Sequence, residues 1–217
     1  GLALYNNTLN GTIPDDLGLL TALTWLNLRT NELTGTIPSS LGQLTALRSL
    51  SLNDNALRGT IPDDLGLLTE LTFLGLFENA LTGAIPSPLG QLVALETLAL
   101  YNNTLTGAIP DDLGLLSALS WLGLYDNELT GTIPSSLGKL TALGTLVLHT
   151  NELKGTIPSE ISNWSNINRA YFYNTNLTGT MPLCSLNKTF IELVADCMEV
   201  NCTCCTHCCP SAMNGIP

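Results

Sequence analysis

The segment Leu26–Pro38, LNLRTNELTGTIP, contains the phrase on which the whole chain is built. Leu26 and Leu28 alternate with polar residues, and this two-residue period is typical of a β-strand with one buried face. Asn31 follows where the chain must turn, and its side chain can serve backbone groups that have lost their strand partners. Gly35 permits close packing or a positive φ, and the closing Ile-Pro ends the segment because proline has no amide hydrogen.

The phrase returns every 24 residues, and a fixed period of this size indicates a solenoid whose stacked units share one core. Further copies begin at Leu2, Leu50, Leu74, Leu98, Leu122 and Leu146, and a degraded copy begins at Ala170. The asparagines equivalent to Asn31 are Asn7, Asn55, Asn79, Asn103, Asn127 and Asn151, which stacking would place in one ladder. We expect about eight parallel strands, forming a sheet roughly 35 Å long at about 4.8 Å per strand.

The connecting segments predict the rest of each unit. LTGTIP predicts a short extended piece on the flank, and the SSLGQL-type arc is too short for a long helix, so we expect 3₁₀ turns there. Two kinds of arc alternate, opened by Asp-Asp or by Ser, so the full sequence unit is 48 residues. The pattern degrades after Ser159, where Thr175 occupies the asparagine position, and Thr189–Ala195 is expected to form a short closing helix.

The pattern L-x-x-L-x-L-x-x-N-x-L-x-G-x-I-P-x-x-L-G-x-L resembles that of plant-type extracellular leucine-rich repeats. Such repeats form the ectodomains of receptor-like kinases and receptor-like proteins, and polygalacturonase-inhibiting proteins. The resemblance implies a right-handed α/β solenoid with a concave parallel sheet, covering residues 1–183. Residues 184–217 would form a Cys-rich C-terminal cap, and the run CTCCTHCC resembles diatom or algal members more than plant ones. No cap precedes Leu2, so we expect this chain to lack its true N-terminus.

Composition limits the classes of partner. Asp and Glu number 18 against 7 Lys and Arg, and the net charge of −11 argues against nucleic acid and anionic membranes. No apolar run is long enough to span a bilayer. Two histidines and no nucleophile or phosphate-binding motif make an enzyme improbable, and we expect no cofactor.

Sequons and cysteines favour a secreted or cell-surface glycoprotein. The Asn-x-Ser/Thr sequons are Asn6, Asn10, Asn102, Asn163, Asn176, Asn187 and Asn201. The cysteines are Cys184, Cys197, Cys202, Cys204, Cys205, Cys208 and Cys209, all in the C-terminal segment. We favour disulfides for them, with zinc bound at a C-x-x-C spacing as the alternative. Three bridges leave one thiol, which would be free or would join another chain.

The concave face carries the candidate binding site. Of twelve Phe, Trp and Tyr residues, eight fall in two columns of outward-facing strand positions. The candidate ligand-binding residues are Trp25, Arg29, Phe73, Phe77, Tyr101, Trp121, Tyr125, His149 and Tyr173. Exposed rings suit stacking on sugars or anchoring a partner, whereas the alternative is that neighbouring rings simply cover one another. Glycans on Asn6 and Asn102 would obstruct part of this face.

Two other patterns have a simpler structural explanation. The aspartate pairs that open every second arc, Asp15-Asp16, Asp63-Asp64 and Asp111-Asp112, are interpreted as capping of the turns rather than as metal sites. The Thr-Gly-Thr segments on the flank resemble an ice-binding array, although threonine also favours extended strands.

We therefore expect an extracellular module that recognises a protein or glycan on its concave face. The alternatives are inhibition of a secreted glycan-degrading enzyme and a structural, adhesive or ice-binding role at a surface.

Overall fold

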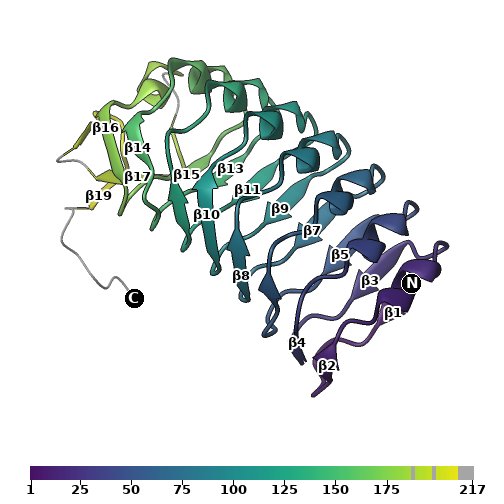
Figure 1. The fold of residues 1–217 in the computed structure, drawn as a ribbon. Coiled ribbons are helices and arrows are strands. Elements are labelled where there is room, and N and C mark those ends of the chain that lie inside the picture. The colour runs from purple at the N-terminus through teal and green to yellow at the C-terminus, as the bar shows by residue number, and fades with distance from the viewer. Residues whose placement is uncertain (187–188, 197–198, 210–217) are drawn as a thin grey trace.

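The computed structural model describes residues 1–186, 189–196 and 199–209, which form one curved solenoid (Figure 1). Each 24-residue repeat makes one rung, which runs from a concave strand through a flank strand to a 3₁₀ turn. The concave strands are β1 (Leu2–Ala3), β3 (Trp25–Asn27), β5 (Ser49–Ser51), β7 (Phe73–Gly75), β9 (Thr97–Ala99), β11 (Trp121–Gly123), β13 (Thr145–Val147), β15 (Arg169–Tyr171), β17 (Glu192–Asp196) and β19 (His207–Cys209).

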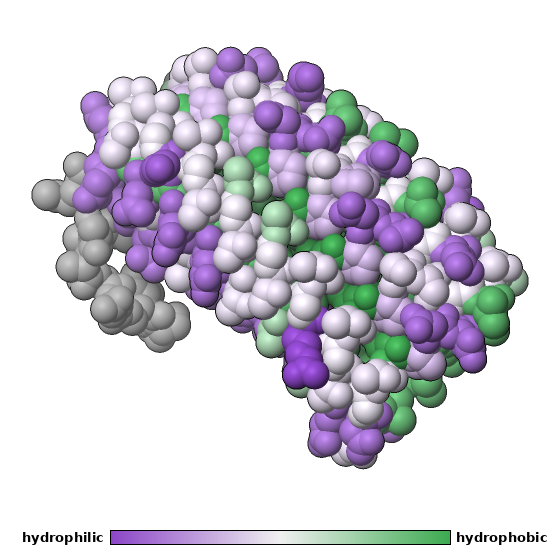
Figure 2. All heavy atoms as spheres, viewed as in Figure 1, coloured by the Kyte–Doolittle hydropathy of each residue, from purple (hydrophilic) through white to green (hydrophobic). Residues whose placement is uncertain are grey.

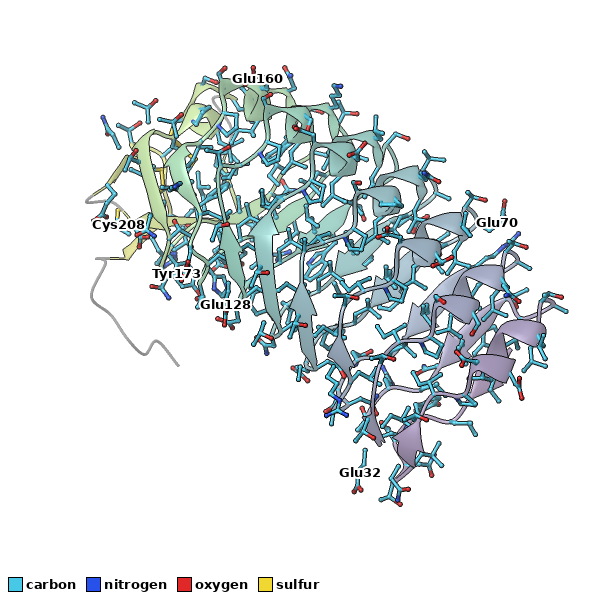
Figure 3. All side chains as sticks on the ribbon, viewed as in Figure 1. Glu32, Glu70, Glu128, Glu160, Tyr173 and Cys208 are labelled. Atoms are coloured by element: carbon cyan, nitrogen blue, oxygen red, sulfur yellow. A yellow bond between two sulfur atoms is a disulfide. The ribbon has the colours of Figure 1, made fainter. Side chains whose placement is uncertain are left out.

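The flank and the outer side complete each rung. The flank strands are β2 (Asn10–Thr12), β4 (Glu32–Thr34), β6 (Arg58–Gly59), β8 (Ala80–Gly83), β10 (Thr104–Ala108), β12 (Glu128–Thr130), β14 (Lys154–Thr156), β16 (Asn176–Thr180) and β18 (Val200–Asn201). The 3₁₀ helices are η1 (Asp15–Leu19), η2 (Ser39–Gln43), η3 (Asp63–Leu67), η4 (Ser87–Gln91), η5 (Asp111–Leu115), η6 (Ser135–Lys139), η7 (Ser159–Asn163) and η8 (Pro182–Leu186). Figure 3 shows Glu32 and Glu128 at the edge near the flank strands, opposite Glu160 on the 3₁₀ edge.

The concave sheet is parallel throughout, in the order β1-β3-β5-β7-β9-β11-β13-β15-β17-β19. Consecutive repeat strands pair without slippage, so that Leu26 lies beside Leu50 and Leu50 beside Leu74. The flank strands pair in three separate parallel sheets, β12-β10-β8-β6, β14-β16-β18 and β2-β4. The expected eight repeat strands, flank strands and 3₁₀ turns are thus confirmed, and the cap adds two further strands to the sheet.

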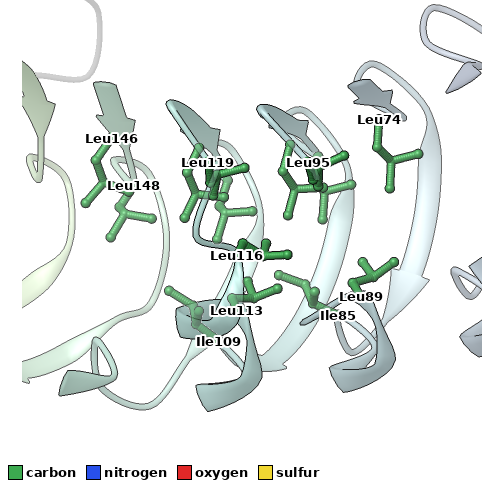
Figure 4. Packing of buried hydrophobic residues seen from close by; sticks show 14 of the residues in the cluster. Leu74, Ile85, Leu89, Leu95, Ile109, Leu113, Leu116, Leu119, Leu146 and Leu148 are labelled. Carbon is green, nitrogen blue, oxygen red and sulfur yellow. The ribbon is translucent and has the colours of Figure 1, made fainter. Parts of the chain in front are cut away.

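Aliphatic side chains from the sheet and the turns fill the interior of the coil (Figure 4). Leu41, Leu44 and Leu47 of one arc are fully buried, as are their equivalents in the following rungs. The glycine inside each 3₁₀ turn lets adjacent turns touch, because a Cβ on Gly90 would lie 2.4 Å from the carbonyl oxygen of Asp112. This close contact lets the 3₁₀ turns of adjacent rungs pack directly against one another.

The asparagine ladder connects each rung to the rung before it. The Asn103 side chain accepts the Leu81 N–H at 3.0 Å through Oδ1 and donates through Nδ2 to the carbonyls of Leu76, Leu100 and Tyr101. The other asparagines of the ladder repeat this arrangement from Asn31 to Asn151. These backbone N–H and C=O groups lie beyond the end of a strand, where the sheet offers them no partner. The asparagine side chain supplies the missing hydrogen bonds.

A left-handed residue precedes each ladder position. These residues have φ between 51° and 58°, and they are Asn6, Thr30, Asp54, Glu78, Asn102, Asp126, Thr150 and Asn174. The turn lets two successive amides reach the next rung, as when Thr30 and Asn31 donate to the carbonyls of Asn53 and Asp54. Asn and Asp tolerate this conformation, whereas Thr and Glu adopt it at a cost.

The end of the solenoid differs from the prediction in one element. Residues Thr189–Ala195 do not form a helix, because Glu192–Asp196 is strand β17, paired in parallel with β15. Asp196 is 2 % exposed, and its carboxylate accepts the backbone N–H groups of Asn174 and Thr175. It therefore supplies acceptors that the next rung would otherwise provide. Burial raises the pKa of this carboxyl above its usual value, although the two backbone donors act in the opposite direction.

Disulfides join the cap. Cys184 is bonded to Cys204, and Cys202 to Cys205. Cys208 is also disulfide-bonded. Cys197 and the side chain of Cys209 lie outside the described residues. Within the described part of the chain, no helix has the length and apolarity to cross a membrane.

Candidate binding face on the concave sheet

Parallel register places the outward-facing residues of the sheet in straight columns that run along the solenoid. The first column contains Trp25, Ser49, Phe73, Thr97, Trp121, Thr145 and Arg169, and the second contains Asn27, Ser51, Gly75, Ala99, Gly123, Val147 and Tyr171. We call these two columns the floor. A third column, just beyond the strands, contains Tyr5, Arg29, Asn53, Phe77, Tyr101, Tyr125, His149 and Tyr173.

The last five residues of the third column form a continuous ring stack, here called the ring wall. Neighbouring ring centroids from Phe77 to Tyr173 lie 4.3, 4.3, 4.7 and 4.3 Å apart, with interplanar angles of 9° to 28°. The rings cover one another's faces, so the wall offers its edges to solvent rather than broad platforms. In this column the rings therefore pack as the alternative interpretation expected, with neighbouring rings covering one another.

The floor presents its aromatic rings in a different way. The Trp121 ring lies over Gly123, where a Cβ would come within 2.1 Å of it, and Phe73 lies over Gly75. Trp121 meets the Tyr101 ring edge-on, at 6.1 Å and 70°. Glycine is thus required because the ring occupies the space of a side chain. Between these rungs the floor carries small residues, so its profile alternates along the solenoid.

A hollow of about 430 Å³ lies at the C-terminal end of this face. It is lined by Trp121, Tyr125, Thr145, Val147, His149, Arg169, Tyr171 and Tyr173. Thr145 and Val147 form its low base, the ring wall bounds one side, and the larger residues of the neighbouring rungs bound the ends. Figure 3 shows Tyr173 at the cap end of the molecule.

Burial favours the neutral forms of the phenols and the imidazole in and beside the hollow. Burial raises the pKa of the Tyr125 and Tyr101 phenols, and lowers that of the His149 imidazole. Burial also raises the pKa of Tyr171 to about 12, helped by its hydrogen bond to the Glu192 carboxylate at 2.6 Å. At neutral pH the surface therefore presents phenol hydroxyls and an uncharged imidazole, with the exposed Arg169 as a cation beside them.

The structure brings together only part of the predicted set. Trp121, Tyr125, His149 and Tyr173 line the hollow, and Phe73, Phe77 and Tyr101 continue the same surface toward the N-terminus. Trp25 and Arg29 lie several rungs away, where Arg29 stacks over Tyr5 at 5.1 Å. Binding by these residues remains a prediction.

Sequence reasoning missed Tyr171, which lines the hollow and bonds to the cap. The alternation of the strand could have predicted it, because the residues on either side of Ala170 must face outward when Ala170 occupies a leucine position.

The remaining predicted sites lie elsewhere. Asn102 belongs to the left-handed turn next to Tyr101, and its glycosylation stays a prediction. The sequon asparagines Asn6, Asn10, Asn163, Asn176 and Asn201 are exposed, and Asn187 lies outside the described residues. The aspartate pairs lie in the first turns of η1, η3 and η5 but make no capping hydrogen bond. Proline occupies the capping position, so the predicted side-chain cap is wrong.

Family models described as leucine-rich repeats match residues 21–81, 94–116 and 118–140. The chain is a plant-type leucine-rich repeat protein. The ectodomain of the Arabidopsis thaliana membrane receptor kinase GASSHO1/SCHENGEN3, in complex with CASPARIAN STRIP INTEGRITY FACTOR 2, is 45 % identical, with a TM-score of 0.86 over 90 % of this chain and 24 % of that one. A plant peptide hormone receptor in complex with its peptide is 36 % identical, with a TM-score of 0.86 over 89 % and 31 %.

A plant ice-binding protein is more distant, at 27 % identity and a TM-score of 0.62 over 83 % of this leucine-rich repeat chain and 74 % of that protein. This chain spans only about a quarter to a third of the length of the two receptor structures named above. None of the curated proteins matches it.

Proposed function

We propose that this leucine-rich repeat chain is part of an extracellular recognition module that binds an extended peptide segment along its concave floor. The observation that carries the proposal is the hollow beside the ring wall, where Trp121 and Tyr171 enclose a small-residue base. Ligand sites are concave and mostly apolar with a few oriented polar groups, which describes this surface. One of the two receptor structures is of a plant peptide hormone receptor in complex with RGF2, and this supports a peptide as the ligand class.

An extracellular setting is supported by the disulfides of the cap and by the exposed sequons. The similar structures are of plant receptors, and this supports binding rather than catalysis as the role of the face. The partner would be held by shape, by ring contacts and by hydrogen bonds to neutral phenols.

The test is selection of binders from a random peptide library displayed on phage, followed by measurement of their affinity for two variants. Trp121→Thr introduces the residue type that Thr97 and Thr145 have at the same column position in the neighbouring rungs, so the variant should fold. Leu115→Gln copies Gln91 at an exposed position on the opposite side of the coil. Selected peptides should bind Trp121→Thr about 30-fold more weakly, as loss of a buried tryptophan anchor predicts, and should bind Leu115→Gln normally. Equal loss or no loss in both variants would remove the proposal.

A second candidate is ice binding on the flank, favoured by the exposed threonines. Thr12, Thr36, Thr60, Thr132, Thr156 and Thr180 form one exposed column, and the plant ice-binding protein shares the fold. Ala84 and Ala108 interrupt this column, and Arg58 and Lys154 interrupt its neighbour. Thermal hysteresis that disappears in Thr36→Lys and Thr132→Lys would support this function, and absence of hysteresis in the parent protein would exclude it.

A further inference from the structure

The 48-residue unit of the sequence becomes a surface profile in the structure. High rungs carry Trp25, Phe73 and Trp121, and the next high rung carries Arg169 with Tyr171. Low rungs lie between them and carry Ser49 with Ser51, Thr97 with Ala99, and Thr145 with Val147. These rungs carry no ring, whereas the Phe73 and Trp121 rings lie over Gly75 and Gly123, so the floor is lower at the rungs beside them. The third low rung is the base of the hollow described above.

The distance between equivalent low positions is therefore two rungs, or about 9.6 Å at about 4.8 Å per parallel strand. A polyproline II helix advances about 9.3 Å per turn, with three residues in each turn. Every third residue of such a helix faces the same side, so three successive turns would present one residue to each of the three low rungs. An extended β-strand, at about 3.3 Å per residue, alternates its faces every two residues and does not match this spacing.

The chemistry of the low rungs fits proline. Each has a small base between larger groups, and rings flank the low rungs built on Ser49 and Thr97 on both sides. Aromatic-lined grooves recognise proline-rich helices because the ligand is already ordered and loses little entropy. A polyproline II backbone has no internal hydrogen bonds. Its carbonyls would remain free to accept from the phenol hydroxyl of Tyr101, which itself accepts from Tyr125 and keeps its own proton at neutral pH because burial raises its pKa.

The charge of the face selects among proline-rich segments. Asp54, Glu78 and Asp126 belong to the turn column directly beyond the wall, and within the described residues none of them forms an ion pair. The chain as a whole carries a net charge of −11. A ligand with lysine or arginine at one position of each turn would place cations on the wall side. Such complementarity favours encounter and fixes the register of the ligand.

We infer that the concave floor binds a basic, proline-rich segment in the polyproline II conformation, with one residue of each turn inserted into each low rung. This inference rests on the proposed peptide-binding function and specifies the ligand class of the same site. The periodic floor explains why the aromatic residues of its first column, Trp25, Phe73 and Trp121, recur at every second rung.

The experiment uses the whole chain and the synthetic peptide (Pro-Pro-Lys)₄, with (Gly-Gly-Lys)₄ as a flexible peptide of equal charge. Isothermal titration calorimetry should give an affinity for the proline peptide at least about tenfold higher than for the glycine peptide, since only the former is preorganised. Phe73→Ser and Trp121→Thr introduce residue types found at the low rungs. Each should weaken binding of the proline peptide by about tenfold or more. Leu115→Gln should leave its binding unchanged, and circular dichroism should show all three variants folded.

Equal binding of the two peptides would overturn the inference, because charge alone would then explain it. An affinity for the proline peptide that is unchanged in Phe73→Ser and Trp121→Thr would overturn the inference as well. A β-linked oligosaccharide that binds the parent chain more tightly than the proline peptide, with loss in the same variants, would identify the floor as a glycan groove instead. Library peptides that depend on Trp121 but lack proline at every third position would refute the inference while the proposed function stands.

Discussion

The asparagine ladder allows a sharp prediction at Asn103, whose side chain is 8 % exposed. In Asn103→Ala, the buried Leu81 N–H loses the acceptor that the ladder provides. The carbonyls of Leu76 and Leu100 each keep a second donor, from Asn79 and Asn127 respectively. One orphaned donor costs about 1–3 kcal/mol, and the lost hydrogen bonds add about 1 kcal/mol, so we expect about 3 kcal/mol of destabilisation.

The matched control is Asn7→Ala in the first rung. Asn7 is exposed and bonds only to the carbonyls of Leu4 and Tyr5, which water can reach after the change. Its cost should stay below about 1 kcal/mol. Urea denaturation followed by circular dichroism measures both. Equal costs for the two variants would show that the ladder contributes through something other than buried backbone satisfaction.

Three further predictions concern the turns and the ring wall. Thr30→Asn should stabilise the protein by about 1 kcal/mol in urea denaturation, because Thr30 is held at φ 54°, which asparagine tolerates better; a loss of stability would contradict the strain. Gly90→Ala should destabilise by about 1–3 kcal/mol through contact with the Asp112 carbonyl, whereas Gly144→Ala, with no atom nearer than 3.6 Å to the new Cβ, should change stability by less than about 0.5 kcal/mol. Burial in the wall lowers the pKa of His149, so the unfolded chain binds the proton more readily, and stability should fall as pH drops below about 6.5 toward the folded-state value; His149→Asn, which copies Asn53, should reduce that slope, and an unchanged slope would exclude His149 as its source.

The repeat phrase predicts most of the fold because each rung repeats one physical solution. Leu26 and its equivalents set the register, and the asparagine fixes the turn, so the columns on the concave face follow from residue positions alone. How the side chains of these columns pack could not be predicted from the sequence. Phe77 and Trp121 are both exposed-face aromatics, yet one stacks in the wall and the other lies flat, and the difference depends on the space that Gly123 leaves.

The cap could not be predicted in the same way. The segment Thr189–Ala195 is a short apolar run, and such runs do not distinguish helix from strand by periodicity. The open edge of β15 decides the outcome, since it offers unpaired backbone groups that β17 satisfies. The role of Asp196 is equally hidden, because its carboxylate accepts the amides of Asn174 and Thr175, whereas in earlier rungs backbone carbonyls of the next rung accept the equivalent amides.

The ladder also gives the solenoid a direction. In each pair of rungs, the later asparagine completes the turn of the earlier one, as Asn55 does for Leu33 and Asn79 for Leu57. During synthesis from the N-terminus, each ladder amide from Leu9 to Leu129 would wait for the asparagine of the next rung, and Asn151 serves the last of them. Trimming the chain from its back would remove the asparagine acceptor of one buried amide at each new end, whereas trimming it from the front would instead remove the carbonyls that accept amides such as those of Arg48 and Ala56.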